Sequence, residues 1–199
     1  MNNKIITTEL IESMRKAGAE EDLLAWLEKK PRSFAELRWQ NRDWATWVAT
    51  SIPLPEEIAD WLYQQGCGRS WWMDGRLHRT DGPAVIRPGG AEEWYLHGLR
   101  HRTDGPAVSS PWGIAEWWCE GEPHRLDGPA IVWGDRLQEW WFRGRKHRLD
   151  GPAVIIAGWG QEWWVNGRRH RADGPAIVRT DGTEEWWVDG RRVQVSCPA

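Results

Sequence analysis

WWVNGRRHRADGPAIV, residues 163–178, holds two tryptophans, an Asn-Gly pair, a His-Arg pair and an Asp-Gly-Pro sequence. Such a cluster is typical either of a functional site or of one unit in a structural repeat. The motif HRxDGPA recurs every 23 residues, beginning at His78, His101, His124, His147 and His170. A constant period of this length indicates a repeat architecture.

A pair of aromatic residues keeps the same 23-residue step, with a glycine four positions after the first of each pair. The pairs begin at Trp71, Trp94, Trp117, Trp140, Trp163 and Trp186, and the glycines are Gly75, Gly98, Gly121, Gly144, Gly167 and Gly190. Residues 69–199 are therefore expected to form five full repeats and a decayed terminal one, which keeps only Pro198-Ala199 of the motif.

Each repeat is expected to form two short antiparallel strands. One strand runs through the aromatic pair, as in EEWWV at 184–188, and ends at an Asn-Gly or Asp-Gly turn. The other is Pro-Ala-(Val/Ile), preceded by Asp-Gly-Pro, where Gly supplies unusual dihedrals and Pro fixes φ. The predicted fold is an all-β repeat array, an antiparallel β-hairpin meander in a single-layer sheet. Both rows of aromatic side chains are interpreted as mainly core.

Residues 1–68 lack the repeat and are predicted to form a small N-terminal α-helical domain. Five tryptophans are expected in its core: Trp26, Trp39, Trp44, Trp47 and Trp61. We interpret this domain as a cap that covers the open edge of the first repeat, joined to it through GCGRS at 66–70. The alternative is that the helical domain itself is the binding module.

Residues 69–199 resemble MORN-type repeats, because 23-residue hairpins carry Trp or Tyr, a following Gly and an Asn-Gly or Asp-Gly turn. They are most similar to the divergent bacterial and phage form with HRxDGPA. The resemblance implies a β-hairpin sheet that acts as a non-catalytic scaffold for protein or lipid-surface contacts. The alternating glycines of the usual YxGxxxxGxxxGxG pattern are missing, which disfavours the lipid surface.

The charge distribution narrows the class of partner. Residues 1–68 carry a net charge of 8 − 11 = −3, whereas residues 69–199 carry 18 − 18 = 0. A neutral repeat region disfavours long nucleic acid. Of the lysines and arginines in that region, all except Lys146 are arginines. Arginine is suited to pairing with carboxylates and to stacking on aromatic rings.

The cysteines and the hydropathy of the sequence disfavour further classes of protein. Cys67, Cys119 and Cys197 form no CxxC motif, which disfavours a disulfide framework or a zinc site. No apolar run approaches the roughly 20 residues that span a bilayer. We therefore expect no integral membrane contact and a cytoplasmic location, in a bacterium or in the host of a phage.

The repeated polar residues are assigned to the scaffold. Equivalent residues lie about 9–10 Å apart, twice the strand spacing, so the histidines cannot share one metal ion. A catalytic site needs one constellation of groups rather than five equal copies. The protein is therefore expected to be no enzyme and to hold no cofactor or metal. The structural residues are His78, Asp81, His101, Asp104, His124, Asp127, His147, Asp150, His170 and Asp173. The arginines are expected to pair with these aspartates or with the glutamates before the aromatic pairs.

Binding residues are expected where the repeats differ. The connecting turns hold the unmatched Trp112, Trp133 and Trp159, and a basic rim follows the hairpin glycines. The rim consists of Arg100, Arg145, Lys146, Arg168 and Arg169. The alternative interpretation is a solvated rim with tryptophans packed at the sheet edge.

These features favour a non-enzymatic repeat protein that binds, and inhibits or scaffolds, a protein partner. A bacterial or phage factor that neutralises a toxin or defence protein fits this hypothesis. The first alternative is sequestration of a nucleotide or other small anionic ligand by Arg and Trp. The second alternative is a structural array that associates with itself into an oligomer.

Overall fold

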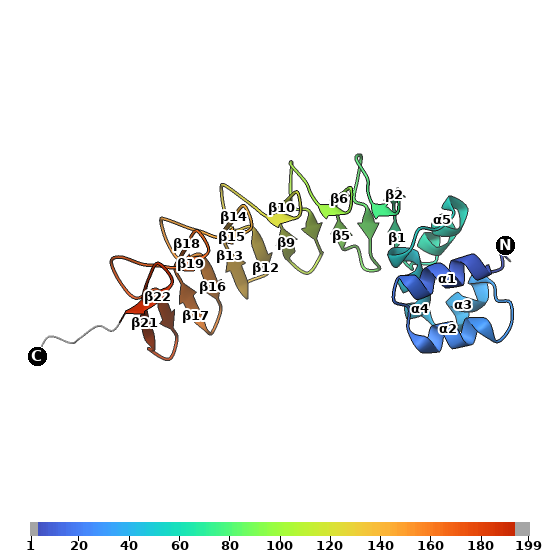
Figure 1. Cartoon of the computed structure of the whole chain (residues 1–199), viewed down its shortest axis with the longest axis horizontal. Coiled ribbons are helices and arrows are strands. Elements are labelled where there is room, and N and C mark those ends of the chain that lie inside the picture. Colours follow the sequence, from blue (N-terminus) through green and yellow to red (C-terminus); the bar gives the residue numbers. More distant parts are fainter. Residues whose placement is uncertain (1–3, 194–199) are drawn as a thin grey trace, which may run out of the picture. The chain divides into compact units, whose positions relative to one another are not determined.

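The computed structural model describes residues 4–193 and divides into two compact units. Described residues up to Gly98 form the first unit, and those from Leu99 onward form the second (Figure 1). The end of the terminal repeat, including Cys197 and Pro198-Ala199, lies outside the described residues.

The first unit begins with five short helices around an apolar core. They are α1 (Thr8–Lys16), α2 (Glu21–Glu28), α3 (Phe34–Gln40), α4 (Arg42–Ser51) and α5 (Glu56–Gln64). Four of the five predicted core tryptophans pack against this core, namely Trp26, Trp44, Trp47 and Trp61. The prediction is wrong for Trp39, which is 89% exposed. Because α3 buries Phe34 and Leu37 on one face, Trp39 projects from the other.

Helices α4 and α5 contact the first strand, β1 (Arg69–Ser70). Strand β1 pairs with β4 (Val85–Ile86). The Ser70 hydroxyl donates a hydrogen bond to the Ala49 carbonyl at 3.0 Å, and Arg69 forms an ion pair with Asp60 of α5. The open edge of the sheet is therefore closed by the helical segment.

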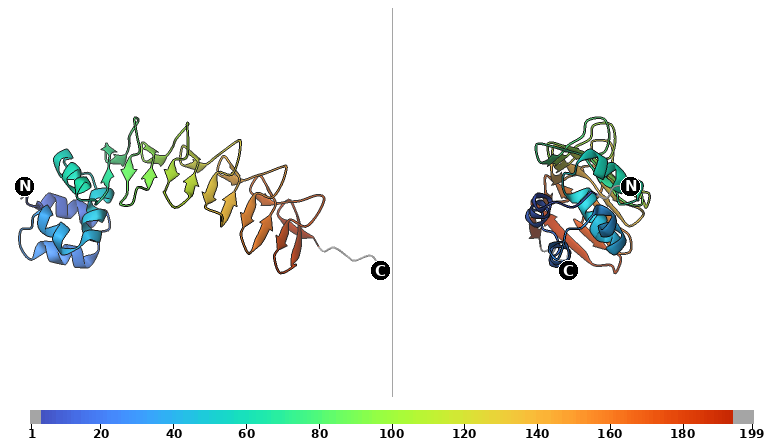
Figure 2. Two further views of the ribbon diagram at one scale, coloured as in Figure 1. Left: turned by 180° about the vertical axis from the view of Figure 1, so that it is seen from behind. Right: turned by 90° about the vertical axis from the view of Figure 1, so that its right-hand side faces the viewer.

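The predicted antiparallel meander is confirmed in both units. In the first unit β4 pairs with β1 and with β5 (Glu92–Glu93). In the second unit the sheet runs in chain order (Figure 2). Its strands are β8 (Val108–Ser109), β9 (Ile114–Glu116), β12 (Ile131–Trp133), β13 (Leu137–Glu139), β16 (Val154–Ile156), β17 (Gly160–Glu162), β20 (Ile177–Arg179), β21 (Glu184–Val188) and β22 (Arg191–Val193). We call these strands the large sheet.

The second aromatic residue of each pair starts a separate small hairpin. The hairpin pairs are β2 (Trp72–Met73) with β3 (Arg76–Leu77), β10 (Trp118–Cys119) with β11 (Glu122–Pro123), β14 (Trp141–Phe142) with β15 (Arg145–Lys146), and β18 (Trp164–Val165) with β19 (Arg168–Arg169). Strands β6 (Tyr95–Leu96) and β7 (Leu99–Arg100) occupy the equivalent sequence positions. The prediction of one continuous aromatic strand holds only for β21, which spans 184–188.

The strand divides because the first tryptophan changes its backbone partners. The Trp117 N–H donates to the Ala130 carbonyl at 2.7 Å, while the Trp117 carbonyl accepts from the His124 N–H at 3.0 Å. The same two bonds are made by Trp71, Trp140 and Trp163. We call these four residues the pivot tryptophans, since each turns the chain from the large sheet into a hairpin.

The hairpin turns have two consecutive residues with positive φ, as Asn-Gly and Asp-Gly turns predict. Asn166 and Gly167 have φ values of 50° and 78°. Glu120-Gly121 adopts the same geometry, with φ values of 50° and 82°. A glutamate at positive φ is strained, whereas asparagine tolerates this region.

We therefore expect Glu120→Asn to raise the free energy of unfolding, by on the order of 1 kcal/mol. The reverse change, Asn166→Glu, should lower it by a similar amount. Urea unfolding of both variants checks the pair. A Glu120→Asn variant no more stable than the parent would show that the turn stores no strain.

Candidate functional site

The arginines of four HRxDGPA motifs are each contacted on three sides, and the fifth, Arg102, donates to Asp104 and to the Pro106 carbonyl. Arg125 Nε donates to Asp127 Oδ1 at 2.8 Å, and Nη1 donates to the Pro129 carbonyl at 3.3 Å. Its Cζ atom lies 3.9 Å from the centroid of the Trp117 ring. Arg79, Arg148 and Arg171 make the equivalent contacts. The predicted pairing of these arginines with aspartates is confirmed.

The motif glycines are required because they have no side chain, and not because of an unusual backbone conformation. We expected them to supply unusual dihedrals, but none of Gly82, Gly105, Gly128, Gly151 and Gly174 has positive φ. A Cβ atom at Gly128 would lie 3.2 Å from Arg125 Cζ, and one at Gly82 would lie 2.7 Å from Arg79 Cζ. Glycine therefore makes room for a guanidinium packed between the backbone and a tryptophan.

The repeated histidines link one hairpin to the next. His124 Nδ1 accepts a hydrogen bond from the Arg143 N–H at 3.1 Å, and His147 Nδ1 accepts from the Asn166 N–H at 3.1 Å. Three more histidines accept in the same way: His78, His101 and His170. Each donor is the first residue of a positive-φ turn. In this arrangement Nδ1 serves as an acceptor and holds the neighbouring turn in place.

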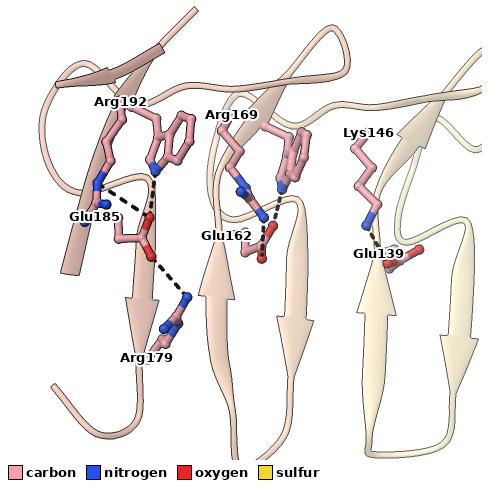
Figure 3. Close-up of polar contacts among 9 residues, drawn as sticks. Glu139, Lys146, Glu162, Arg169, Arg179, Glu185 and Arg192 are labelled. Carbon is pink, nitrogen blue, oxygen red and sulfur yellow. Dashed lines mark hydrogen bonds and ion pairs between the residues drawn. The ribbon is translucent and has the colours of Figure 1, made fainter. Parts of the chain in front are cut away.

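A row of glutamates supports the second aromatic residues (Figure 3). Glu162 accepts from Trp164 Nε1 at 2.7 Å and from Arg169 Nη2 at 3.4 Å. Glu139 accepts from Trp141 Nε1 and from Lys146 Nζ, both at 2.8 Å. The cations on these glutamates belong to the predicted basic rim, whereas the motif arginines pair with aspartates instead. A cation and a tryptophan N–H on each carboxylate offset the cost of removing its charge from water.

The five cations of the predicted basic rim fall into two groups. Arg100, Lys146 and Arg169 pair with glutamates of the large sheet. Arg145 and Arg168 are exposed, and neither forms an ion pair within residues 4–193. Only this second group is left to bind something outside the chain.

Arg145 and Arg168 line one cleft of about 600 Å³ between hairpins β14–β15 and β18–β19. Its lining also includes Trp141, Lys146, Trp164 and Asn166. We call it the hairpin cleft. The structure thus brings Arg145, Lys146 and Arg168 together.

The three unmatched tryptophans lie elsewhere. Trp112 and Trp159 are in turns of the large sheet, whereas Trp133 is the last residue of β12 and donates from Nε1 to Glu116 at 3.1 Å. Trp112 is 68% exposed and Trp133 is 50% exposed, while Trp159 is half-buried with Arg179 Cζ 5.3 Å from its ring centroid. Within the second unit these turns lie at the opposite end of the large-sheet strands from the hairpins (Figure 1). We call this row of turns the turn edge. It is a surface separate from the hairpin cleft.

Backbone hydrogen bonds tie the turns of the turn edge together. The Gly134 N–H donates to the Gly113 carbonyl at 2.8 Å, and the Ala157 N–H donates to the Arg136 carbonyl at 2.9 Å. The Thr180 N–H donates to the Trp159 carbonyl at 2.9 Å. The exposed tryptophans therefore stand on an ordered row rather than on independent loops.

Sequence reasoning missed two exposed leucines in the HRxDGPA loops. Leu126 is 81% exposed and Leu149 is 79% exposed. They occupy the variable position of the motif, where the other repeats have Thr80, Thr103 and Ala172. Together they border a cleft of about 710 Å³ that Phe142 also lines. The change from Thr to Leu at one register position is the signal that could have revealed them.

No group of three or more His, Cys, Asp or Glu side chains in the described part of the chain is arranged to hold a metal ion. Among the same residues, no helix has the length and apolar character needed to cross a membrane. Comparison with protein-family models finds no match, and comparison with curated proteins finds none either.

The histidine link can be measured by a matched pair of substitutions. His124→Ala should remove the acceptor of the Arg143 N–H and destabilise the fold by about 1 kcal/mol. His124→Asn keeps an oxygen at the place of Nδ1 and should recover most of this loss. Both variants lose the ring contact with Phe142, so the difference between them isolates the hydrogen bond. Equal hydrogen-exchange rates of the Arg143 amide in the two variants would contradict the assignment.

The motif aspartates make stability depend on pH. The hydrogen bond from Arg125 lowers the pKa of Asp127, and the equivalent arginines lower the pKa values of Asp81, Asp104, Asp150 and Asp173. A carboxylate with a lowered folded-state pKa stabilises the fold above the ordinary value of about 4, and this stabilisation is lost as pH falls through the folded-state pKa. Asp127→Asn should therefore be less stable than the parent at pH 7, and the gap should close in acid.

Asp135→Asn is the control, because Asp135 is an exposed turn aspartate with no ion pair among residues 4–193. The same substitution there removes a carboxylate without removing an ion pair. Urea midpoints between about pH 7 and pH 3 compare the variants. A gap for Asp127→Asn that does not change with pH would contradict the pairing as a source of stability.

Proposed function

We propose that the chain is a non-enzymatic binding protein and that its turn edge docks a protein partner. The observation that carries this proposal is the exposure of Trp112, in one turn, and of Trp133, at the end of β12 beside the next turn, with the two turns joined by a backbone hydrogen bond. Large aromatic side chains are costly to expose and are the commonest anchors of protein interfaces. An ordered row of turns also presents them with little loss of conformational freedom on binding.

The placement of the repeated polar residues supports the same proposal. The histidines, arginines and aspartates of HRxDGPA contact one another, the pivot tryptophans and the next hairpin, so they are engaged in holding the array together. Several large apolar side chains at positions that differ between repeats, among them Trp112, Leu126 and Leu149, are exposed. A surface of this kind recognises a shape rather than carrying out a reaction.

The resemblance of the repeats to bacterial and phage MORN-like proteins gives the proposal its biological form. On this proposal the chain inhibits or scaffolds a toxin or defence protein in the bacterial cytoplasm, or in the cytoplasm of a phage-infected host. Trp112 and Trp133 supply the anchors. Trp159, whose ring lies beside the Arg179 guanidinium, adds a third aromatic side chain at the next turn.

A photo-crosslinking residue at position 135, in the turn after Trp133, tests the docking surface. In lysate of the cell that produces the chain, we expect one discrete protein adduct. Trp112→Ser should weaken its formation by about tenfold or more, as expected for an interface anchor. Trp39→Ser makes the same chemical change at an exposed tryptophan of α3 and should leave the adduct unchanged.

Two outcomes would contradict the proposal. One is the absence of any adduct at position 135. The other is an adduct that Trp112→Ser and Trp39→Ser affect equally. Circular dichroism of both variants confirms that each is folded before the comparison is made.

A further inference from the structure

The hairpin cleft is a second surface of the array, and it carries positive charge that no ion pair within residues 4–193 neutralises. Four hairpin cations lie at or beside it, and two of them are bound internally: Lys146 by Glu139 and Arg169 by Glu162 (Figure 3). Arg145 and Arg168 have no acidic partner within the described chain. Two guanidinium groups therefore face solvent from neighbouring hairpins on one cleft.

The backbone directs Arg145 toward its neighbour. A Cβ atom at Gly167 would lie 3.6 Å from Arg145 Cβ, 3.7 Å from Cγ and 3.8 Å from Cδ. The aliphatic stem of Arg145 thus lies flat along the turn of hairpin β18–β19, immediately before Arg168. The stem of Arg168 lies in the same way along Gly190 of the following turn, so the two arginine stems run side by side, one repeat apart.

The rest of the cleft has a different chemistry. Trp141 and Trp164 line it, and their indole N–H groups are already bound to Glu139 and Glu162. These two rings consequently offer ring carbons rather than hydrogen-bond donors. The volume of about 600 Å³ lies within the range of small-molecule sites.

We propose that the hairpin cleft binds a phosphate ester that carries a planar organic group, with a nucleotide as the representative of this class. The phosphate lies between Arg145 and Arg168, and the planar group lies against Trp141 and Trp164. A phosphate carries the double negative charge that two guanidinium groups require, and its oxygens fit their paired N–H donors. This site goes beyond the proposed docking of a protein on the turn edge.

The chain offers its own matched substitutions at this site. The residue after each hairpin glycine lies over the next hairpin glycine: Leu99 over Gly121, Glu122 over Gly144, Arg145 over Gly167 and Arg168 over Gly190. We call it the crossing position. Because leucine occupies it at residue 99, Arg145→Leu and Arg168→Leu are changes that the fold already accommodates.

Isothermal titration calorimetry of the full chain with ATP at low ionic strength tests the proposal. Arg145→Leu and Arg168→Leu should each weaken binding at least about tenfold, the loss expected for a charge-assisted hydrogen bond. Arg191→Leu, at the crossing position of the terminal repeat, should leave affinity unchanged. Glu122→Leu should raise affinity, because it removes a carboxylate that lies against Gly144 at the border of the cleft.

Other ligands separate the sources of binding. Tripolyphosphate should bind more weakly than ATP, and adenosine should not bind. Equal affinities for ATP and tripolyphosphate would overturn the role of the tryptophans. Hexaglutamate that binds as tightly as ATP would overturn the phosphate class in favour of an acidic protein segment.

Two further results would overturn the site as a whole: no heat with ATP at millimolar concentration, or equal affinity in the parent and in Arg145→Leu. Thermal unfolding of every variant shows that it is folded. The two proposals fail separately, because ATP binding is measured on the isolated chain and Arg145→Leu leaves the turn edge intact.

Discussion

The pivot tryptophans determine how this chain can fold. Each gives its N–H to the carbonyl of a motif alanine just before a sheet strand and receives a histidine N–H on its own carbonyl, so one residue connects a sheet strand to a hairpin. The strands on either side are only two or three residues long, apart from β21. Strands of this length do not persist alone. The repeat holds together because Trp, Arg and Gly form one packed unit at every pivot, with the arginine between ring and backbone.

The neutral charge of the repeat region has a structural explanation. Arginines bind the motif aspartates on one side, and the hairpin cations bind the large-sheet glutamates on the other. Both sets of cations also lie over tryptophan rings, as Arg125 does over Trp117 and Arg169 over Trp164. Planar guanidinium groups suit this double contact better than an ammonium group, which accounts for the near absence of lysine. Arg145 and Arg168, at positions that differ between repeats, are among the charged residues that form no ion pair within residues 4–193.

The period, the meander and the positive-φ turns could be predicted because each depends on residues close together in the sequence. The division of the aromatic strand could not, since alternation of side chains says nothing about where a backbone N–H and carbonyl find their partners. The roles of the histidines and motif glycines could not be predicted either, because they depend on contacts in three dimensions rather than on neighbouring residues in the sequence. His124 acts on Arg143 in the following repeat, and Gly128 matters for the volume that it leaves to Arg125. The candidate residues were predicted as one group, yet Trp133 ends a strand of the large sheet while Arg145 lies in a small hairpin.

Because the side chain at the crossing position covers the hairpin of the next repeat, residues of two neighbouring repeats line each cleft between hairpins. Glu122 covers the hairpin that carries Arg145, and Arg145 covers the hairpin that carries Arg168. The order of the repeats therefore matters as much as their content. Duplicating, deleting or exchanging one 23-residue unit would leave the pivots and histidine links of the remaining units in place, yet it would create new neighbours where the units are joined. An array built in this way can change its binding surface by rearrangement alone, without a single substitution in the residues that hold it together.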